Sequence, residues 1–311
     1  MFTKAIVGFD GSERALDALA LAESLISRDG ELVICHARVK RWFGSKPTEH
    51  RRRHQPAERV LARARERVGG RVRVRCRALI GRSTVVALQR ATKDERADLI
   101  VLGSSHRGPV GRVLPGSVTE GVLHGSRCSV AVAPVGMHRA LSSGLTAIAV
   151  GVDGKPASAD AAKFAAALAG ELDAKLRLVA VADLTPRMAA SSGYALVYPA
   201  MVEARRAQAQ EALAQIVDIL PTELEVIPET YEGDPAQQLL ALSGGVDLLV
   251  LESRGRGTLK RIALGSVCGH VVRKAACPVL VLAATRRTEH AVAGLELASS
   301  SVSAQSPVGP T

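Results

Sequence analysis

Two short motifs that each occur twice combine residues suited to binding a phosphorylated ligand. The first is an acid in a glycine-containing turn, Asp10 in VGFDGS and Asp153 in VGVDGK. The second is a Gly-Ser pair opening a helical pattern, at Gly116 and Ser117 and again at Gly265 and Ser266. A glycine-rich turn leading into a helix presents unpaired N–H groups and the positive end of the helix dipole, which suit phosphate. The sequence has no Gly-Lys-Ser/Thr and no GxGxxG after the first apolar run, so neither common phosphate-loop motif applies.

These motifs belong to a long internal repeat. The segment Ala97–Pro134 returns as Val246–Ala283, and AIVGFDGS at Ala5–Ser12 returns as AVGVDGKP at Ala149–Pro156. A repeat of this length is far longer than a solenoid unit, so we predict that each copy is a domain. We call residues 1–137 copy one and residues 145–285 copy two.

Each copy alternates short apolar runs with helical patterns, which predicts βαβ units and a parallel sheet covered on both faces. The runs are Ala5–Phe9, Leu32–Val39, Val72–Ile80, Leu99–Gly103 and Ser129–Pro134 in copy one, and Ile148–Val152, Leu176–Ala182, Leu224–Pro228, Leu248–Leu251 and Val279–Leu282 in copy two. Helical patterns in copy one cover Arg14–Ser27, Pro56–Val68, Ser83–Lys93 and Ser117–His124. We therefore predict an α/β fold of two tandem doubly wound domains, each with a five-stranded parallel sheet. Residues 138–144 are predicted to be a polar linker, and residues 286–311 a disordered Ser/Pro-rich tail.

The composition excludes several other classes of protein. The chain has 311 residues, of which 47% are hydrophobic and 23% charged, too apolar a mixture for disorder throughout. We find no apolar stretch long enough to span a membrane, and Asp10 interrupts the N-terminus before a signal peptide could form. The five cysteines form no CxxC pair, which favours buried thiols in a reducing cytosol and hence a cytoplasmic protein.

The formal net charge of +11 comes from one segment. Between Arg38 and Arg77 there are 15 basic residues and three acids, and Arg71, Arg73, Arg75 and Arg77 alternate along one face of a predicted strand. We interpret this segment as a solvated loop followed by an edge strand that its charges protect from pairing. Nucleic-acid binding is the less favoured interpretation, because only Trp42 and Phe43 are available to stack on bases.

Several separated motifs now agree, in order, with one known family. The opening VGFDGS, the DLIVLGSS block, GSVTEGVL and RCSVAV of copy one, with their equivalents in copy two, resemble the universal stress protein family in its tandem two-domain form. The resemblance extends from Lys4 to about Ala284 and implies Rossmann-like domains that bind adenine nucleotides. It implies that ATP, with or without Mg²⁺, binds through the pattern Gly-x2-Gly-x9-Gly-Ser/Thr. It also implies that the acid after strand one contacts the nucleoside and that backbone near the end of strand two meets adenine.

Carried onto this chain, the resemblance implies a set of binding residues in each copy. They are Gly8, Asp10, Ala37, Gly103, Ser104, His106, Arg107, Gly108, Gly116, Ser117 and Val118 in copy one, and Gly151, Asp153, Val181, Arg254, Gly255, Gly257, Gly265, Ser266 and Val267 in copy two.

Both copies depart from the pattern, at different positions. In copy one the second glycine is His106, a residue type that tolerates positive φ and that adds a positive charge when protonated. In copy two the first glycine is Glu252, which places a negative charge beside the phosphates. Our hypothesis is that copy one is the better ATP site. The positive charges of Arg254 and Arg256 in copy two would offset part of the negative charge of Glu252.

Simpler structural explanations stand beside these assignments. Asp10 and Asp153 are suited to capping the following helix, and Ser117 with Glu120 reads as a capping box. His36 is read as a packed histidine, and no spacing indicates a metal site or catalytic machinery.

The resemblance implies a non-enzymatic regulator in stress or growth arrest that acts through ATP-dependent binding. The alternatives are a nucleotide-free module that binds a protein partner through residues 38–77, or a slow ATPase. We expect the last strands of the two copies to pair as a pseudo-dimer within the chain, and a homodimer of chains is a further option.

Overall fold

The computed structural model describes residues 1–39, 56–70, 72–105, 110–140, 144–185, 194–253, 262 and 264–283. Copy one contains β1 (Phe2–Gly8), α1 (Glu13–Leu25), β2 (Ile26–Val39), α2 (Ala57–Arg67), β3 (Arg73–Gly81), α3 (Thr84–Asp94), β4 (Leu99–Gly103), α4 (Ser117–Leu123), β5 (Ser129–Ala133) and α5 (Met137–Ala140). Copy two contains β6 (Ala147–Val152), α6 (Pro156–Leu172), β7 (Lys175–Asp183), α7 (Tyr194–Val217), β8 (Val226–Gly233), α8 (Pro235–Leu242), η2 (Ser243–Gly245), β9 (Leu248–Glu252), α9 (Ser266–Val271) and β10 (Val279–Leu282).

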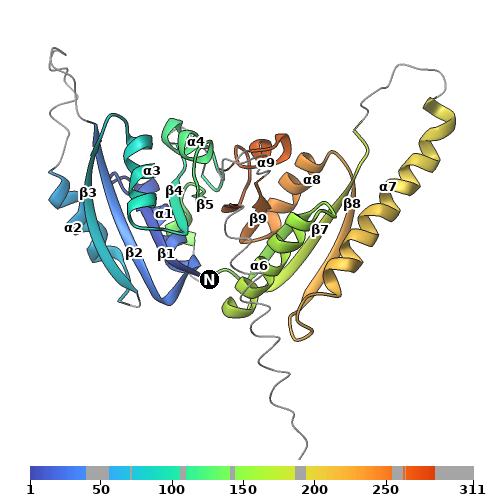
Figure 1. Ribbon diagram of the computed structural model, residues 1–311, viewed down its shortest axis with the longest axis horizontal. Helices are drawn as coiled ribbons and strands as arrows, with labels where there is room; N and C mark the ends of the chain where they lie inside the picture. The colour runs from blue at the N-terminus through green and yellow to red at the C-terminus, as the bar shows by residue number, and fades with distance from the viewer. Residues whose placement is uncertain are drawn as a thin grey trace, which may run out of the picture.

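The strands of both copies form one continuous sheet in the order β3-β2-β1-β4-β5-β10-β9-β6-β7-β8. Pairing is parallel within each copy, and β5 pairs with β10 in the antiparallel sense, with Ala131 opposite Leu280. The predicted α/β fold is therefore confirmed, and the two last strands lie side by side as expected (Figure 1).

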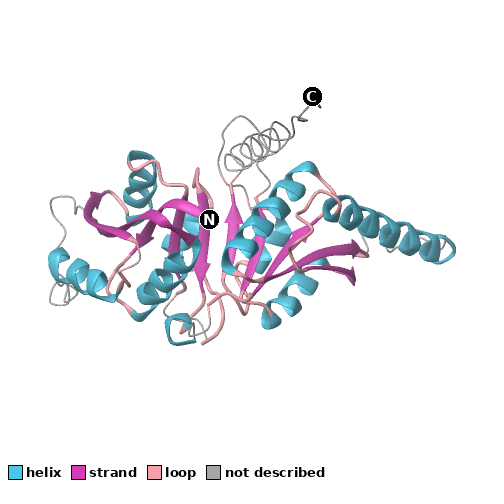
Figure 2. Cartoon of the chain, turned by 90° about the horizontal axis from the view of Figure 1, so that it is seen from below, coloured by secondary structure: helices cyan, strands magenta, loops and turns pink. Residues whose placement is uncertain are grey.

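Helices cover both faces of this sheet (Figure 2). Buried side chains of α1, α2, α6 and α7 join one apolar cluster, whereas those of α3, α4, α8 and α9 join the cluster on the other face. In α1 the buried positions Ala15, Ala18, Leu19, Ala22 and Leu25 have helical spacing, which explains why this segment packs as a helix. The first cluster also crosses between the copies, because the rings of Phe2 and Phe164 lie 5.1 Å apart.

An aspartate that recurs in the repeat has a structural task. Asp98 accepts hydrogen bonds from the amide and hydroxyl of Thr3, at 2.8 and 2.9 Å. In copy two, Asp247 accepts the same two bonds from Thr146, at 2.8 and 2.7 Å. Each aspartate thus fixes the start of the first strand of its copy to the start of the fourth.

Several predicted boundaries differ from the structure. The helix predicted over Arg14–Ser27 ends at Leu25, because Ile26 already belongs to the long strand β2, which pairs with Phe2 of β1. The strand predicted at Leu224–Pro228 instead spans Val226–Gly233. The tail beyond residue 285 and the whole of the loop 40–55 lie outside the described residues.

The first part of the predicted linker is a docked helical turn. Asp17, which is buried in α1, accepts hydrogen bonds from the amides of Gly136 and His138, both at 2.9 Å, and lies 2.6 Å from His138 Nδ1. Arg139 pairs with Glu13 at 2.8 Å. Because these contacts hold α5 against α1, residues 138–140 belong to the packed body of copy one.

Candidate functional site

The strand order places a topological switch point at the same place in each copy. β1 lies between β2 and β4, and the helices that follow β1 and β4 cover opposite faces of the sheet. In open α/β sheets, ligands bind at such a switch point, beyond the carboxyl ends of the strands. The equivalent point in copy two lies between β6 and β9.

The turn after β1 presents the first predicted site residue. Asp10 is exposed, and its Oδ1 accepts a hydrogen bond from the amide of Ser12 at 3.0 Å. Gly11 has φ +86°, a conformation that suits glycine in a tight turn. Ser12, not Asp10, is the N-cap of α1, because its hydroxyl accepts from the amide of Ala15 at 3.3 Å. The helix-capping explanation for Asp10 is therefore wrong.

Copy two builds the same turn with a different neighbour. Asp153 Oδ1 accepts from the amide of Lys155 at 3.2 Å, and its other oxygen forms an ion pair with the Lys155 ammonium. Burial acts to raise the pKa of the Asp153 carboxyl, but the bonds from Lys155 outweigh it and hold that pKa below its usual value. Lys155 occupies the N-cap position of α6 without a side-chain cap, so Asp153 does not cap the helix either.

The glycine-rich loop of copy one is closed at its neck by short hydrogen bonds. The amide of Ser105 donates to the carbonyl of Leu114 at 2.6 Å, and the amide of Leu114 donates to Ser104 Oγ at 3.2 Å. Ser104 Oγ also donates to the carbonyl of Ala133 at 2.7 Å. Ser104 therefore holds the loop on the sheet with its hydroxyl. In copy two, the equivalent Ser253 Oγ is buried and has no hydrogen-bond partner among the described residues.

Gly103, the last residue of β4, is fixed by a close backbone approach. A Cβ at this position would lie 2.2 Å from the carbonyl oxygen of Arg14 in the first turn of α1 and 3.0 Å from the Arg14 Cβ. Only glycine fits at that separation. Arg14 therefore stands beside the head of the loop, where our sequence analysis did not place it. The sequence shows only that Arg14 lies four residues after Asp10, and this spacing does not reveal the contact with Gly103.

The helices after the loops begin as predicted but are capped differently. Gly116 and Gly265 are the N-caps of α4 and α9, with no side-chain cap, and Ser117 and Ser266 are the exposed first residues of these helices. The predicted capping box of Ser117 and Glu120 is therefore wrong: a capping box needs the hydroxyl at the N-cap, which Gly116 occupies.

Glu120 instead reaches across to copy two. Its Oε1 lies 3.0 Å from Nε of Arg273, which follows α9. Copy two has Gly269 at the position equivalent to Glu120, so this ion pair has no counterpart in the other direction.

The predicted residues on the adenine side lie at the same carboxyl edge. Gly8 pairs with Cys35 across β1 and β2, and Gly151 pairs with Val179 across β6 and β7. A Cβ at Gly8 would lie 2.6 Å from Leu102 Cδ2, so packing alone explains this glycine. The side chains of the remaining predicted residues on this side are half-buried against the second apolar cluster: Ala37, Val118, Val181 and Val267.

Six predicted residues lie outside the described part of the chain: His106, Arg107, Gly108, Arg254, Gly255 and Gly257. Their assignments remain predictions. His36 is half-buried, and its Nδ1 lies 2.9 Å from the Phe9 carbonyl oxygen, in accord with a packed histidine.

The loops of the two copies are held together by a symmetric pair of backbone hydrogen bonds. The amide of Val113 donates to the carbonyl of Ala275, and the amide of Ile262 donates to the carbonyl of Ser126, both at 2.8 Å. Val113 and Ile262 are equivalent in the repeat, as are Ser126 and Ala275. Each loop is thus anchored to the other copy, next to the β5–β10 junction.

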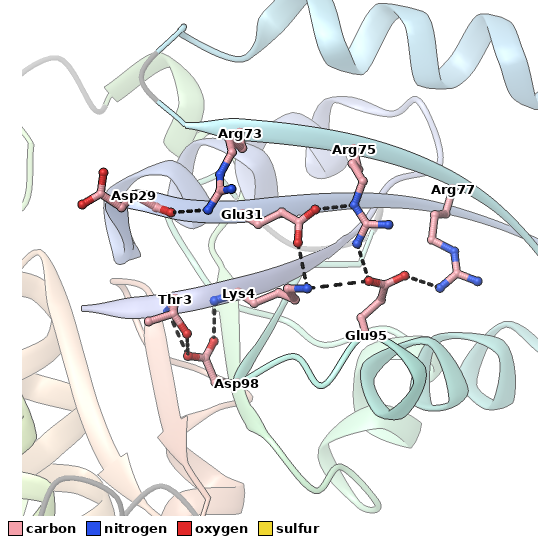
Figure 3. A network of polar contacts seen from close by, with 9 residues as sticks. All are labelled: Thr3, Lys4, Asp29, Glu31, Arg73, Arg75, Arg77, Glu95 and Asp98. Carbon is pink, nitrogen blue, oxygen red and sulfur yellow. Dashed lines mark hydrogen bonds and ion pairs between the residues drawn. The ribbon is translucent and has the colours of Figure 1, made fainter. Parts of the chain in front are cut away.

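Two of the three arginines of β3 form ion pairs with acids, and Arg73 donates to the carbonyl of Asp29 (Figure 3). Arg75 pairs with Glu31 and Glu95, Arg77 pairs with Glu95, and Lys4 lies 2.7 Å from Glu31. Hydrogen bonds from Arg75 and Lys4 lower the pKa of Glu31 to about 2. Because β3 is an edge strand of the sheet, the edge-strand interpretation is confirmed, and in the described part of this strand the charges form a structural network.

The described residues offer no sign of other chemistry. No cluster of His, Cys, Asp or Glu among them has a metal-binding arrangement, and none of the helices they form has the length and apolarity needed to cross a membrane. All five cysteines are free thiols, and burial raises the pKa of Cys35 and Cys277 to about 12.

The fold and the edge described above define a doubly wound α/β protein with a topological switch point in each of two copies. The sequence profile of the universal stress protein family matches residues 1–134 and 145–283, so the chain belongs to that family.

Individual relatives agree with this assignment. The chain is 30% identical to the universal stress protein Mb2028c of Mycobacterium bovis over 221 residues, which cover 70% of this chain and 72% of the relative. It is 33% identical over 140 residues to the universal stress protein MJ0531 of Methanocaldococcus jannaschii, covering 43% of this chain and 80% of the relative. The crystal structure of a universal stress protein from Archaeoglobus fulgidus has the same fold, with a TM-score of 0.58 over 90% of this chain and 95% of that one, at 21% identity.

Proposed function

We propose that copy one binds ATP at the carboxyl edge between β1 and β4, and that the protein acts in stress or growth arrest through nucleotide-dependent binding. One observation carries this proposal: the Asp10 turn, the glycine neck of the loop and the start of α4 all lie at the switch point of copy one. Family membership supports it, since the resemblance described above implies ATP binding through these motifs.

The groups at this edge suit the parts of a nucleotide. The exposed carboxylate of Asp10 is an acceptor for ribose hydroxyls, and its second oxygen takes part in no hydrogen bond with the described residues. The first amides of α4, with Gly116 at the N-cap, and the cation Arg14 provide donors for phosphate.

We propose binding rather than turnover. The described groups of the site are amide donors, one arginine and the carboxylate of Asp10, which can hold a nucleotide. Hydrolysis also needs a group that activates water, and the described residues suggest none in a suitable position.

Isothermal titration of the full chain with ATP tests the proposal. We expect Asp10→Ala to weaken binding at least tenfold, because a hydrogen bond to a charged group is lost. The matched variant Asp153→Ala in copy two should leave the affinity unchanged, since Lys155 already occupies that carboxylate. Absence of ATP binding to the wild-type chain at millimolar concentration, or equal losses in both variants, would contradict the proposal.

A further inference from the structure

Arg14 is the most unusual charged residue near the candidate site. It is the second residue of α1, and its backbone packs directly against Gly103 at the head of the loop. Its Nε is buried without a hydrogen-bond partner, and the structure shows no ion pair for its guanidinium within the described residues. A buried guanidinium nitrogen without an acceptor is costly, so this position favours an anion from outside the chain.

The acids nearest to Arg14 in sequence are committed elsewhere. Glu13 pairs with Arg139 at 2.8 Å, and Asp17 accepts three contacts from the start of α5. Asp10 accepts from the Ser12 amide within its own turn. None of the three is bonded to Arg14.

Its place in the helix points in the same direction. The N-terminus of a helix carries positive partial charge, and cations are disfavoured there. An arginine in the first turn, beside the N–H groups of α1 and the glycine loop, therefore adds to a field that attracts an anion. A guanidinium also matches phosphate oxygens in a planar, bidentate geometry.

Copy two has the opposite charge at the same place. The second residue of α6 is Ala157, and the last residue of β9 is Glu252, where copy one has Arg14 and Gly103. At these two positions, the exchange of Arg for Ala and of Gly for Glu makes the copies differ by two charges. A polyphosphate chain carries several negative charges, so this difference acts on the phosphates far more than on the nucleoside.

We propose that Arg14 contacts the phosphate chain of the nucleotide in copy one, and that the pair Arg14 and Gly103, against Ala157 and Glu252, decides which copy binds triphosphate. This inference rests on the proposed function of the copy-one site. It adds a specificity-determining residue that the family pattern does not contain.

Titrations with ATP and with adenosine separate a phosphate contact from a general effect on the site. In Arg14→Ala, ATP affinity should fall at least tenfold, whereas adenosine affinity stays within twofold of the wild type. The dependence of ATP affinity on salt should also become shallower, because one cation has been removed. Arg14→Lys keeps the charge but loses the planar fork, so we expect an intermediate affinity. Arg90→Ala, on the exposed face of α3, is the matched control and should bind ATP like the wild type.

The reciprocal change in copy two makes the test independent of any loss of folding in copy one. Ala157→Arg combined with Glu252→Gly should raise the number of ATP molecules bound per chain from one to two. An unchanged number, or an equal loss of ATP and adenosine affinity in Arg14→Ala, would overturn the inference. If the wild-type chain binds no ATP at all, the proposed function fails. If the wild type binds ATP and Arg14→Ala binds it equally well, only the inference about Arg14 fails.

Discussion

The two copies share one scaffold and differ where a ligand would sit. In each, an aspartate turn follows the first strand, glycine precedes the helix after the loop, and the loop is anchored to the other copy. Copy one brings Arg14 against Gly103 at the head of its loop, whereas copy two has Ala157 and Glu252 there. Duplication has thus preserved the backbone at this edge while changing the charge at the head of the loop.

The outer ends of the sheet differ in the same way. A Cβ at Gly11 would contact Val60 of α2, and a Cβ at Gly154 would contact Ala212 of α7, so these two helices occupy equivalent places. Residues 56–82 contain nine arginines and two glutamates, whereas the equivalent residues 208–234 contain seven acids and no lysine or arginine. The buried positions within residues 56–82 and 208–234 are apolar in both copies. The surface charge of these segments has therefore changed while their apolar packing has been kept.

The largest expected effect comes from making the loop head of copy one like that of copy two. Gly103→Glu forces a Cβ to within 2.2 Å of the Arg14 carbonyl oxygen, so the start of α1 must move. We expect a loss of about 3 kcal/mol in the free energy of unfolding, at the upper part of the range for overpacking. Urea unfolding measures it. The control is Gly116→Ala, where the nearest atom to the new Cβ would be 3.8 Å away, so only a loss of about 1 kcal/mol or less is expected, from alanine at the N-cap of α4. Equal losses in the two variants would refute this explanation of Gly103.

The second-largest difference between the copies is expected at Asp17, which holds α5 against α1 in copy one. Asp17→Ala leaves the amides of Gly136 and His138 without their acceptor, so we expect a loss of about 2 kcal/mol. The equivalent acid of copy two, Asp160, is only half-buried, and Asp160→Ala should cost less than about 0.5 kcal/mol. Thermal unfolding of both variants compares them, and a larger cost for Asp160→Ala would contradict the structure.

The charge network of Figure 3 predicts a smaller effect that depends on pH. Since the pKa of Glu31 is lowered to about 2 in the folded chain from an ordinary 4.5, its contribution is fully present above about pH 4.5 and is lost as the pH falls towards 2. Glu31→Gln should cost about 1 kcal/mol at pH 7 and almost nothing near pH 2.

In copy two, the ion pair to compare with the Glu31 network is an isolated pair on the surface, Lys175 and Glu225. Lys175 occupies the position of Glu31 and pairs with Glu225 at 2.9 Å, with both side chains more than half exposed. Glu225→Gln should therefore change stability by no more than about 0.3 kcal/mol at either pH. Denaturant titrations at pH 7 and near pH 2 distinguish the two, and a Glu31→Gln variant insensitive to pH would argue against the network.

The smallest effect is expected at the junction of the copies. Glu120 and Arg273 are both nearly half exposed, so their ion pair should contribute about 0.5 kcal/mol. A double-mutant cycle with Glu120→Gln and Arg273→Gln measures the coupling directly. Zero coupling would show that this ion pair adds nothing to the contacts that hold the copies together.

Periodicity and repetition in the sequence predict most of the fold. The limits of β4 and β10 are predicted without error. Asp98 and Ser104 bound the apolar run of β4, and Pro278 marks the start of β10. The end of α1 is not, because Ile26 suits either a helix or the strand that begins there, and pairing with β1 decides the matter. Similarly, no local pattern shows that His138 docks on Asp17 from 121 residues away.

The candidate site is predictable only where a motif is continuous in sequence. Asp10, Gly103 and Gly116 were identified because their turns are recognisable. Arg14 was missed, because its importance comes from a contact with the end of β4, 89 residues further along the chain. The predicted capping box was wrong although its local pattern, S-V-T-E, is complete. Gly116 is the N-cap of α4, so Ser117 is the first residue of the helix and not its cap.

The number of ATP molecules bound per chain is the most direct test of the asymmetry between the copies. Native mass spectrometry of the full wild-type chain, titrated with ATP, reports that number without assuming which residues bind. The account predicts a single ATP per chain over the concentration range that saturates copy one. Two ATP molecules bound with equal affinity would contradict the asymmetry, and a chain that binds none would contradict the site itself.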